Sequence, residues 1–205
     1  CGQKYSGKEA PLAKEGTLDL SNWNFLKDGP VKLKGQWYFW WQRFVEPSEL
    51  GAESLPSGSA FFNMPGMWNG FAGFGEGGKV PEVSGFGSFI LRIKLPEGAA
   101  AVYLDRAATA YELFQKDVYS GAVSPVMANG RVGKDAASSV PEYLHQTGRI
   151  HAGAKEVLLI WHISNFHEKA NGPRNVMLIG DAETIENKLL FDRLQDVALI
   201  GVLGI

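Results

Sequence analysis

The sequence contains a single cysteine and no cluster of basic residues. Because Cys1 has no partner in the chain, no internal disulfide can form, and the core must be stable through packing alone. The 20 Lys and Arg residues are balanced by 22 Asp and Glu, which gives a net charge of −2. A surface that neutralises nucleic-acid phosphates needs clustered Lys and Arg. We therefore expect no nucleic-acid partner.

Sequence motifs of the common enzyme classes are also missing. The chain has no P-loop, no Gly-x-Ser-x-Gly elbow and no His-Glu-x-x-His. Its acidic residues are scattered, mostly in expected loops, rather than placed as a glycosidase pair. We expect no catalytic residues and no cofactor. A pair of acids, or a Ser and a His, that only the fold brings together in one cleft remains open as the enzyme alternative.

Four histidines are present, and two of them lie close together in sequence. His162 and His167 are five residues apart, on an expected strand and the turn after it. Strand alternation would put them on opposite faces, which disfavours a shared metal ion. We interpret His162 as a hydrogen-bonded core imidazole and expect no metal site.

What the chain does contain is apolar and aromatic residues in a β-type pattern. Hydrophobic residues make up 45% of the sequence, which excludes a disordered chain. Trp37, Phe39 and Trp41 alternate with Tyr38 and Trp40, so the first three are expected to share a buried face. Short strands are predicted throughout, without helical patterns between them, at 31–34, 37–41, 60–64, 89–95, 101–104, 110–114, 118–119, 157–163 and 176–179. This pattern predicts an all-β sandwich over residues 17–187.

Two stretches are expected to be loops because of their composition. Residues 66–87 carry eight glycines, and residues 120–140 are rich in Gly, Ala, Ser and Pro. The first of these also carries Trp68, Phe71 and Phe74, which is unusual for a loop. Phe71 and Phe74 could fold over a ligand.

The two ends of the chain differ from the middle. Residues 1–16 are polar and are interpreted as a tether, and a Cys at position 1 followed by small polar residues resembles a processed, acylated bacterial lipoprotein. A chain that merely happens to start at Cys1 is the alternative. Residues 185–194 have helical spacing, and residues 197–205 are uncharged. We divide the chain into a tether (1–16), a sandwich (17–187), and a juxtamembrane helix with the start of a truncated transmembrane helix (188–205), with a buried C-terminal helix as the equal alternative for the last part.

Several short motifs, in order along the chain, resemble a known family. They are LDLSNW at 18–23, DGPVKLKGQWYF at 28–39, MPGMWN at 64–69, GSF at 87–89 with LRI at 91–93, TAYELF at 109–114, ISNFH at 163–167, GPR at 172–174 with IG at 179–180, and LIGVL at 199–203. Together they resemble the extracellular sensor domain of bacterial seven-transmembrane receptors with diverse intracellular signalling modules.

The resemblance implies a fold, a location and partners. The fold would be a galactose-binding-like jelly roll, similar to the sugar-binding domains of β-galactosidase-type glycosidases. The chain would lie outside the inner membrane, on its periplasmic face, anchored by an N-terminal lipid, a C-terminal transmembrane helix or both. A ligand would bias the membrane helices and so a cytoplasmic output module, and a homodimer is a further possibility.

Candidate ligand contacts are side chains that suit a sugar. Aromatic faces stack on the apolar face of a pyranose, while amides and Arg bond its hydroxyls. Each candidate also has a structural interpretation: Trp68 as a plug at one end of the sandwich, Asn165 as a turn former, Arg174 as a partner of a nearby carboxylate. The candidates are Trp68, Asn69, Tyr111, Asn165, His167 and Arg174.

Three functions are therefore weighed. The first is a membrane-anchored sensor for a small carbohydrate-like ligand. The second is a carbohydrate-binding lipoprotein module that has no signalling role. The third is a glycosidase or esterase, which would need reactive groups to converge in one cleft.

Overall fold

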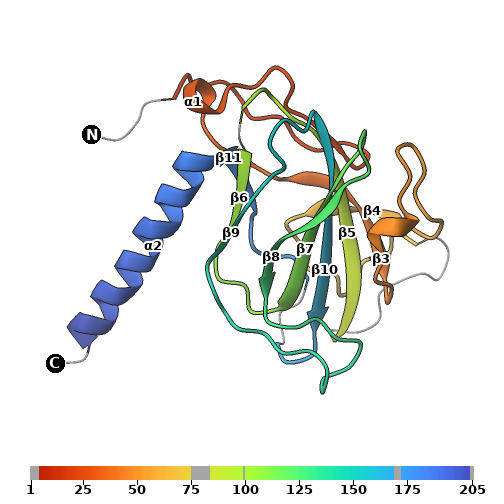
Figure 1. The fold of residues 1–205 in the computed structure, drawn as a ribbon. Helices are drawn as coiled ribbons and strands as arrows, with labels where there is room; N and C mark the ends of the chain where they lie inside the picture. Colours follow the sequence, from red (N-terminus) through yellow and green to blue (C-terminus); the bar gives the residue numbers. More distant parts are fainter. Residues whose placement is uncertain (1–4, 75–83, 99, 169–171, 204–205) are drawn as a thin grey trace.

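A computed structural model describes residues 5–74, 84–98, 100–168 and 172–203, and it consists of two facing antiparallel sheets with a C-terminal helix (Figure 1). The larger sheet runs in the order β4 (Ala60–Met64), β3 (Gly35–Trp41), β5 (Gly85–Lys94), β10 (Glu156–Asn165), β7 (Ala110–Asp117) and β8 (Val123–Asn129), and β1 (Thr17–Asp19) pairs in parallel with β5. The smaller sheet runs β2 (Val31–Lys32), β11 (Leu178–Asp181), β6 (Ala100–Leu104) and β9 (Gln146–Arg149). The predicted β-sandwich with a C-terminal helical segment is confirmed.

The core lies between the two sheets and is dominated by aromatic rings. Trp37 and Phe39 of β3 are fully buried there, and Trp41 packs against the same cluster. The alternation read from the sequence therefore gives the correct inner face of β3. The central strand β10 is buried along its whole length because it has neighbours on both sides and covered faces.

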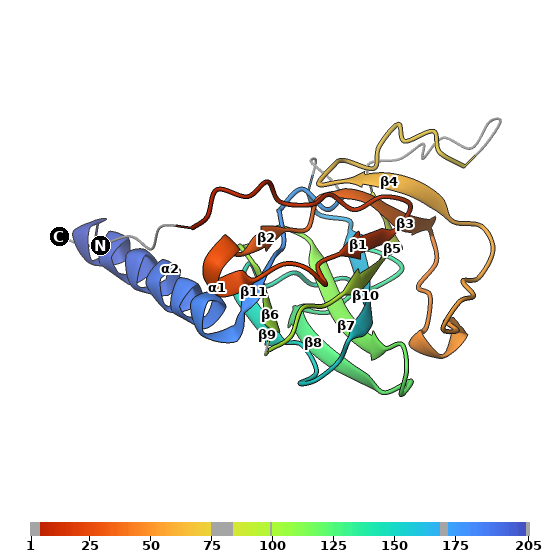
Figure 2. The ribbon, with the colours of Figure 1, turned by 90° about the horizontal axis from the view of Figure 1, so that it is seen from above.

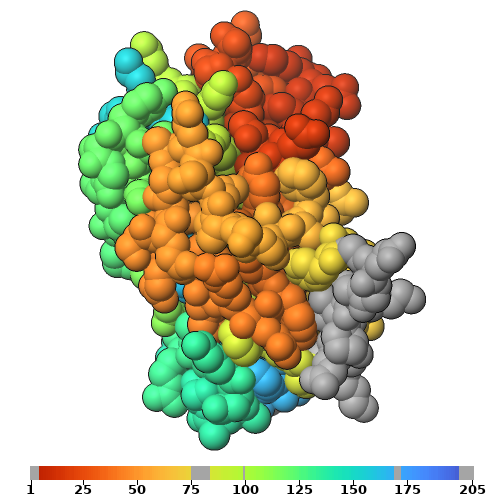
Figure 3. All heavy atoms as spheres, turned by 90° about the vertical axis from the view of Figure 1, so that its right-hand side faces the viewer, coloured from red at the N-terminus to blue at the C-terminus, as the bar shows by residue number. Residues whose placement is uncertain are grey.

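The outer face of the larger sheet is covered as well. Trp40, Ile90 and Ile160 point away from the first core and form a second cluster with Leu50. Leu50 belongs to the segment after β3, which includes the short 3₁₀ helix η1 (Pro47–Glu49). In Figure 3 this segment, in orange, lies across the centre of the face. The middle of this sheet is therefore covered on both faces, which is why β10 reads as a continuous apolar run.

The sequence interpretation was wrong about four strands. Strand β8 lies inside the stretch 120–140 that was expected to be loop, and β9 was not foreseen. Strand β5 begins at Gly85 rather than at Phe89, and the strand expected at 118–119 is the turn after β7. Strand β8 is an edge strand next to β7 and exposes half of its residues, so it needs few apolar side chains and tolerates Pro125. Strand β5 needs a glycine at position 87, because a Cβ there would lie 2.5 Å from the Trp40 carbonyl oxygen. The missing side chain lets the neighbouring strand β3 come close.

Two helices lie outside the sandwich. The single-turn helix α1 (Phe25–Asp28) was not predicted, and Asn24 caps its first turn. Helix α2 (Ala182–Leu203) begins three residues before the helical pattern expected from residue 185. It starts at Ala182 because the Asp181 carboxylate accepts a hydrogen bond from the Thr184 amide at 2.9 Å, as an N-cap does.

Helix α2 packs against the outer side of the smaller sheet with its first half and then extends beyond the sandwich (Figures 1 and 2). Ala182 and Ile185 contact Ala101 and Tyr103 of β6. Farther along, four large apolar side chains are exposed to solvent: Leu190, Phe191, Leu194 and Val197. None of the helices in the described ranges is long and apolar enough to cross a bilayer. The predicted lipid-bearing Cys1 lies outside the described residues.

Candidate ligand-binding site

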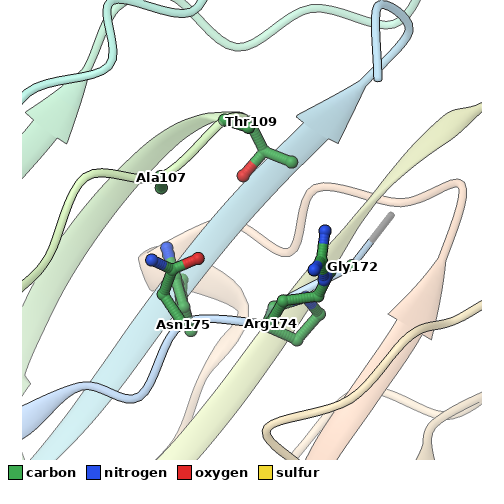
Figure 4. A pocket seen from close by; sticks show the side chains of 8 residues that line it. Ala107, Thr109, Gly172, Arg174 and Asn175 are labelled. Carbon is green, nitrogen blue, oxygen red and sulfur yellow. The ribbon is translucent and has the colours of Figure 1, made fainter. Parts of the chain in front are cut away.

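One end of the sandwich carries a narrow recess of about 20 Å³, which is room for about one water molecule. One wall is the stretch Ala107–Thr109, just before β7, and the other is Gly172–Asn175 in the connection from β10 to β11 (Figure 4). Trp161 of β10 also lines it. The recess thus lies where loops from both sheets meet over the aromatic core, a common place for ligands in β-sandwich proteins.

The first wall is held in place by a buried amide. Asn129, at the end of β8, is fully buried, and its Nδ2 donates to the carbonyl oxygens of Ala107 (3.0 Å) and Thr109 (2.9 Å). Its Oδ1 accepts from the Leu144 amide at 3.0 Å. Two of these bonds are buried and the third is partly buried, so together they hold this wall in place without a ligand.

The second wall is locked to neighbouring loops. The Gly66 amide donates to the Pro173 carbonyl at 3.0 Å, and the Asn175 side-chain amide donates to the Arg106 carbonyl at 2.8 Å. Gly172 has a φ of +90°, and a Cβ there would lie 2.9 Å from the Trp68 amide nitrogen. Only glycine meets both requirements without strain, so the wall depends on this residue.

Beneath the recess lies a group of aromatic residues whose polar atoms are buried. The ring of Trp161 lies 6.1 Å from that of Trp37 and 5.9 Å from that of Tyr111. Among the described residues, the two indole Nε1 atoms and the Tyr111 hydroxyl have no hydrogen-bond partner. Leaving such a group buried and unpaired costs about 1–3 kcal/mol. Burial also raises the pKa of Tyr111, so this phenol stays neutral and remains a donor.

The rim carries a cation and no carboxylate. The side chain of Arg174 is exposed at the mouth, and no carboxylate of the described chain lies within ion-pair distance of its guanidinium. The remaining polar side chains at the recess are Thr109 and Asn175. The recess therefore offers mainly hydrogen-bond donors and one positive charge.

Three of the predicted contacts lie at or below this recess. Arg174 is at its rim, and Tyr111 is fully buried beneath Trp161. Trp68 is also fully buried, with its ring 6.4 Å from that of Phe39, so it closes this end of the core beside the second wall. The structure thus gathers these residues at one end of the molecule and leaves Arg174 accessible. A ligand role for each stays a prediction.

The other predicted contacts lie in the surrounding loops. Asn69 is exposed next to Trp68. Asn165 exchanges two hydrogen bonds of 3.0 Å with the backbone of Glu168, which is the turn-forming arrangement. His167 Nε2 lies 2.8 Å from the Ser139 carbonyl oxygen and ties two loops together.

The phenylalanines expected to fold over a ligand pack on the core in this structure. The ring of Phe71 lies 5.1 Å from that of Phe62, and the ring of Phe74 lies 5.4 Å from that of Phe39. They extend the aromatic core at the same end of the sandwich, next to Trp68.

His162 lies on the far face of β10 from the recess. It is buried, its Nε2 is 2.9 Å from the Val45 carbonyl oxygen, and burial lowers its pKa. It is therefore a hydrogen-bonded core imidazole, as predicted. No group of three or more metal-ligating side chains is found in the described part of the chain.

A separate groove of about 560 Å³ brings a serine and a histidine together. It is lined by Asp117, Tyr119 and His151, and His151 Nε2 lies 2.6 Å from Ser124 Oγ. The Asp117 carboxylate accepts instead from the Ser120 hydroxyl and from two backbone amides. Within the described residues no carboxylate bonds to His151, so the third member of a catalytic triad is not in place.

Sequence reasoning missed most of the recess. Ala107, Ala108 and Asn175 have no chemistry that marks them, and Trp161 sits in an apolar run that reads as plain core. Asn129 carried a usable signal, because a buried Asn at the end of a strand must find partners for its amide.

Comparisons with known proteins agree on the fold. No family model and no curated protein matches the sequence. The structure resembles a β-glucuronidase from Faecalibacterium prausnitzii with a TM-score of 0.50 and 10% identity, over 73% of this chain and 31% of that one. A GH2 β-galacturonidase from Eisenbergiella tayi, bound to galacturonate, gives 0.46 and 12%, over 74% and 24%.

The likeness to the β-glucuronidase shows a fold and no more. The chain spans about a quarter to a third of the length of both neighbours, and the identity is too low to transfer an activity. The fold is a galactose-binding-like β-sandwich of the kind found within these glycosidases. The comparisons do not bear on the resemblance to seven-transmembrane receptors, which remains a prediction.

Proposed function

We propose that this domain binds a small carbohydrate-like ligand at the recess between 107–109 and 172–175. The observation that carries the proposal is the exposed guanidinium of Arg174, which has no carboxylate partner among the described residues, at the mouth of a recess whose walls are held by buried hydrogen bonds. This guanidinium and the side chains of Thr109 and Asn175 can form hydrogen bonds with the hydroxyl groups of a sugar. The shared fold with sugar-processing enzymes is consistent with this.

The test is direct binding with a blocked recess. Ala108→Leu adds a bulky side chain at the partly exposed wall, and we expect it to weaken binding in a calorimetric screen of monosaccharides by tenfold or more. Ala152→Leu, in the separate groove, is the matched control and should bind as the wild type does. Equal binding by both variants would show that the ligand does not bind at the recess.

We further propose that the domain serves as the extracytoplasmic sensor of a membrane-anchored signalling receptor. The motif series and the exposed apolar residues of helix α2 support this, because a ligand can signal only by favouring one arrangement of the domain and its helices. A carbohydrate-binding lipoprotein module without signalling is the second candidate. Cys1 acylation and pairing of two copies belong to the same proposal.

The full-length gene product separates these two candidates. A receptor should carry several apolar segments of about 20 residues each besides this domain. In such a receptor, we expect Ala108→Leu to abolish the change in output that a binding sugar causes. A gene product without further apolar segments would rule out the receptor and favour the carbohydrate-binding module without signalling.

A further inference from the structure

The contact between helix α2 and the sandwich is built around one buried histidine. His145 is 9% exposed and lies in the connection between β8 and β9. Its Nδ1 is 2.9 Å from an oxygen of Asp105, which follows β6, and its Nε2 is 3.0 Å from an oxygen of Asp196 in α2. The ring therefore bridges a loop of the sandwich and the second half of the helix.

Both ring nitrogens face carboxylates, and this fixes the number of protons on the ring. A neutral imidazole carries one N–H and one lone pair, whereas an imidazolium carries two N–H groups. A lone pair held at hydrogen-bond distance from a carboxylate oxygen is repelled by its negative charge. The observed arrangement, with a carboxylate at each nitrogen, is therefore that of the charged ring.

The tyrosine beside the ring does not offer the neutral form a substitute. The Tyr103 hydroxyl lies 3.1 Å from Nδ1, but it donates its proton to Asp192 of the helix. Burial raises the pKa of Tyr103, so the hydroxyl keeps this single proton. A neutral ring must therefore lose its contact with Asp196, draw the Tyr103 proton away from Asp192, or leave a buried nitrogen without a partner.

Other charged groups surround the ring from the helix and from the loop before β7. They are Asp105, Arg106, Lys188, Asp192, Arg193 and Asp196. Lys188 pairs with Asp192 at 2.8 Å. Arg106 lies 3.2 Å from the second oxygen of Asp196, and Arg193 donates to the backbone carbonyl of the histidine at 3.4 Å. Carboxylates, lysines and arginines stay ionised between about pH 5.5 and 9, whereas an imidazole titrates within this range.

We propose that His145 is a proton-sensitive clamp, which holds the second half of helix α2 against the sandwich while the ring is charged and releases it when the ring loses a proton. The sign follows from the contacts. Because the docked helix needs the charged ring, docking is strongest on the acid side and weakens as the pH rises through the range in which an imidazole titrates. The clamp does not depend on the proposed sugar site.

The experiment measures hydrogen exchange of amides 190–198 by mass spectrometry at about pH 6 and about pH 8.5, with each rate divided by that of an unstructured peptide at the same pH. Protection in the wild type should fall ten- to a hundredfold from the lower to the higher pH, the size expected for a charged hydrogen bond. His145→Gln does not titrate, so its protection should be weak and equal at both pH values. Amides of β5 and β10 are the internal control and should not lose protection.

A second variant tests the number of protons on the ring. The side-chain amide of Asp105→Asn can donate to a neutral Nδ1, so the neutral ring then satisfies both of its contacts. We expect α2 to stay protected at the higher pH in this variant. Asp19→Asn, at an exposed ion pair with Lys94, is the matched control and should show the wild-type loss.

The ring nitrogens provide a direct readout. Their ¹⁵N signals, assigned by their loss in His145→Gln, should show two N–H groups at about pH 6. A single N–H at that pH, or equal protection of α2 at both pH values, would overturn the proposal. So would a loss of the wild-type size in His145→Gln or Asp105→Asn, or a parallel loss in β5 and β10.

Discussion

His162 is a buried ionisable side chain whose protonation opposes folding. Burial lowers its pKa below the usual 6.5, so the unfolded chain binds a proton more readily than the folded one. The neutral imidazole is compatible with the fold above pH 6.5, and stability should fall as the pH drops below that value towards the folded-state pKa.

This dependence can be measured as a difference between two proteins. We expect the free energy of unfolding of the wild type, from urea titrations, to lose up to about 1.4 kcal/mol per pH unit relative to His162→Gln below pH 6.5. Glutamine keeps a donor for the Val45 carbonyl and does not titrate. Parallel curves for wild type and His162→Gln would contradict the assignment.

Gly172 offers a second test at the scale of one residue. An alanine there would have a strained φ and a Cβ 2.9 Å from backbone, so we expect Gly172→Ala to lower stability by about 2–3 kcal/mol. Gly153→Ala is the matched control, since Gly153 has a φ of +77° and open space around it. This variant should lose only about 1 kcal/mol of stability, which is the cost of placing an alanine in the left-handed backbone conformation. If thermal unfolding showed similar losses of stability for both variants, the backbone of the second wall would be able to shift and make room for the added methyl group.

Helix α2 is the element whose position depends most on polar contacts. His145 is buried beside it, with Nδ1 2.9 Å from an Asp105 oxygen and Nε2 3.0 Å from an Asp196 oxygen. Tyr103 bonds to Asp192, whose carboxylate also pairs with Lys188 at 2.8 Å. These contacts hold the second half of the helix, where its apolar residues are exposed.

Removing the polar ring nitrogens of His145 should therefore loosen the helix without unfolding the sandwich. We expect His145→Phe, which keeps a ring beside Tyr103 but no N–H, to speed hydrogen exchange of amides 190–198 about ten- to a hundredfold, the size expected for losing charged hydrogen bonds. Gln195→Ala, on the exposed side, should leave exchange unchanged. Faster exchange in strands β5 and β10 as well would mean that the helix and sandwich unfold as one unit.

At the scale of the whole molecule, one loop joins the recess to helix α2. The Arg106 carbonyl accepts from Asn175 in the second wall, while its guanidinium lies 3.2 Å from Asp196 of the helix. Asp105, the residue before it, contacts His145. If a bound ligand stabilises this loop further, the loop should also hold the helix more firmly, because coupling between sites is reciprocal.

This coupling has a measurable outcome that depends on the proposed ligand site. A sugar that binds the wild type should slow hydrogen exchange of the α2 amides. His145→Phe should bind the same sugar more weakly, by the factor by which the sugar no longer slows exchange of these amides. Ligand binding that leaves α2 exchange unchanged would show that the two sites are independent.

The sequence alone determined the class of fold, the inner face of β3 and the core position of His162, because alternation of apolar residues depends only on local geometry. It missed β8 and β9, whose residues need little burial at an edge, and the walls of the recess at 107–109 and 175. Those residues carry no distinctive chemistry of their own. Only tertiary packing brings them over Trp161 and leaves its Nε1 without a partner, because loops far apart in sequence meet only when the two sheets close on each other.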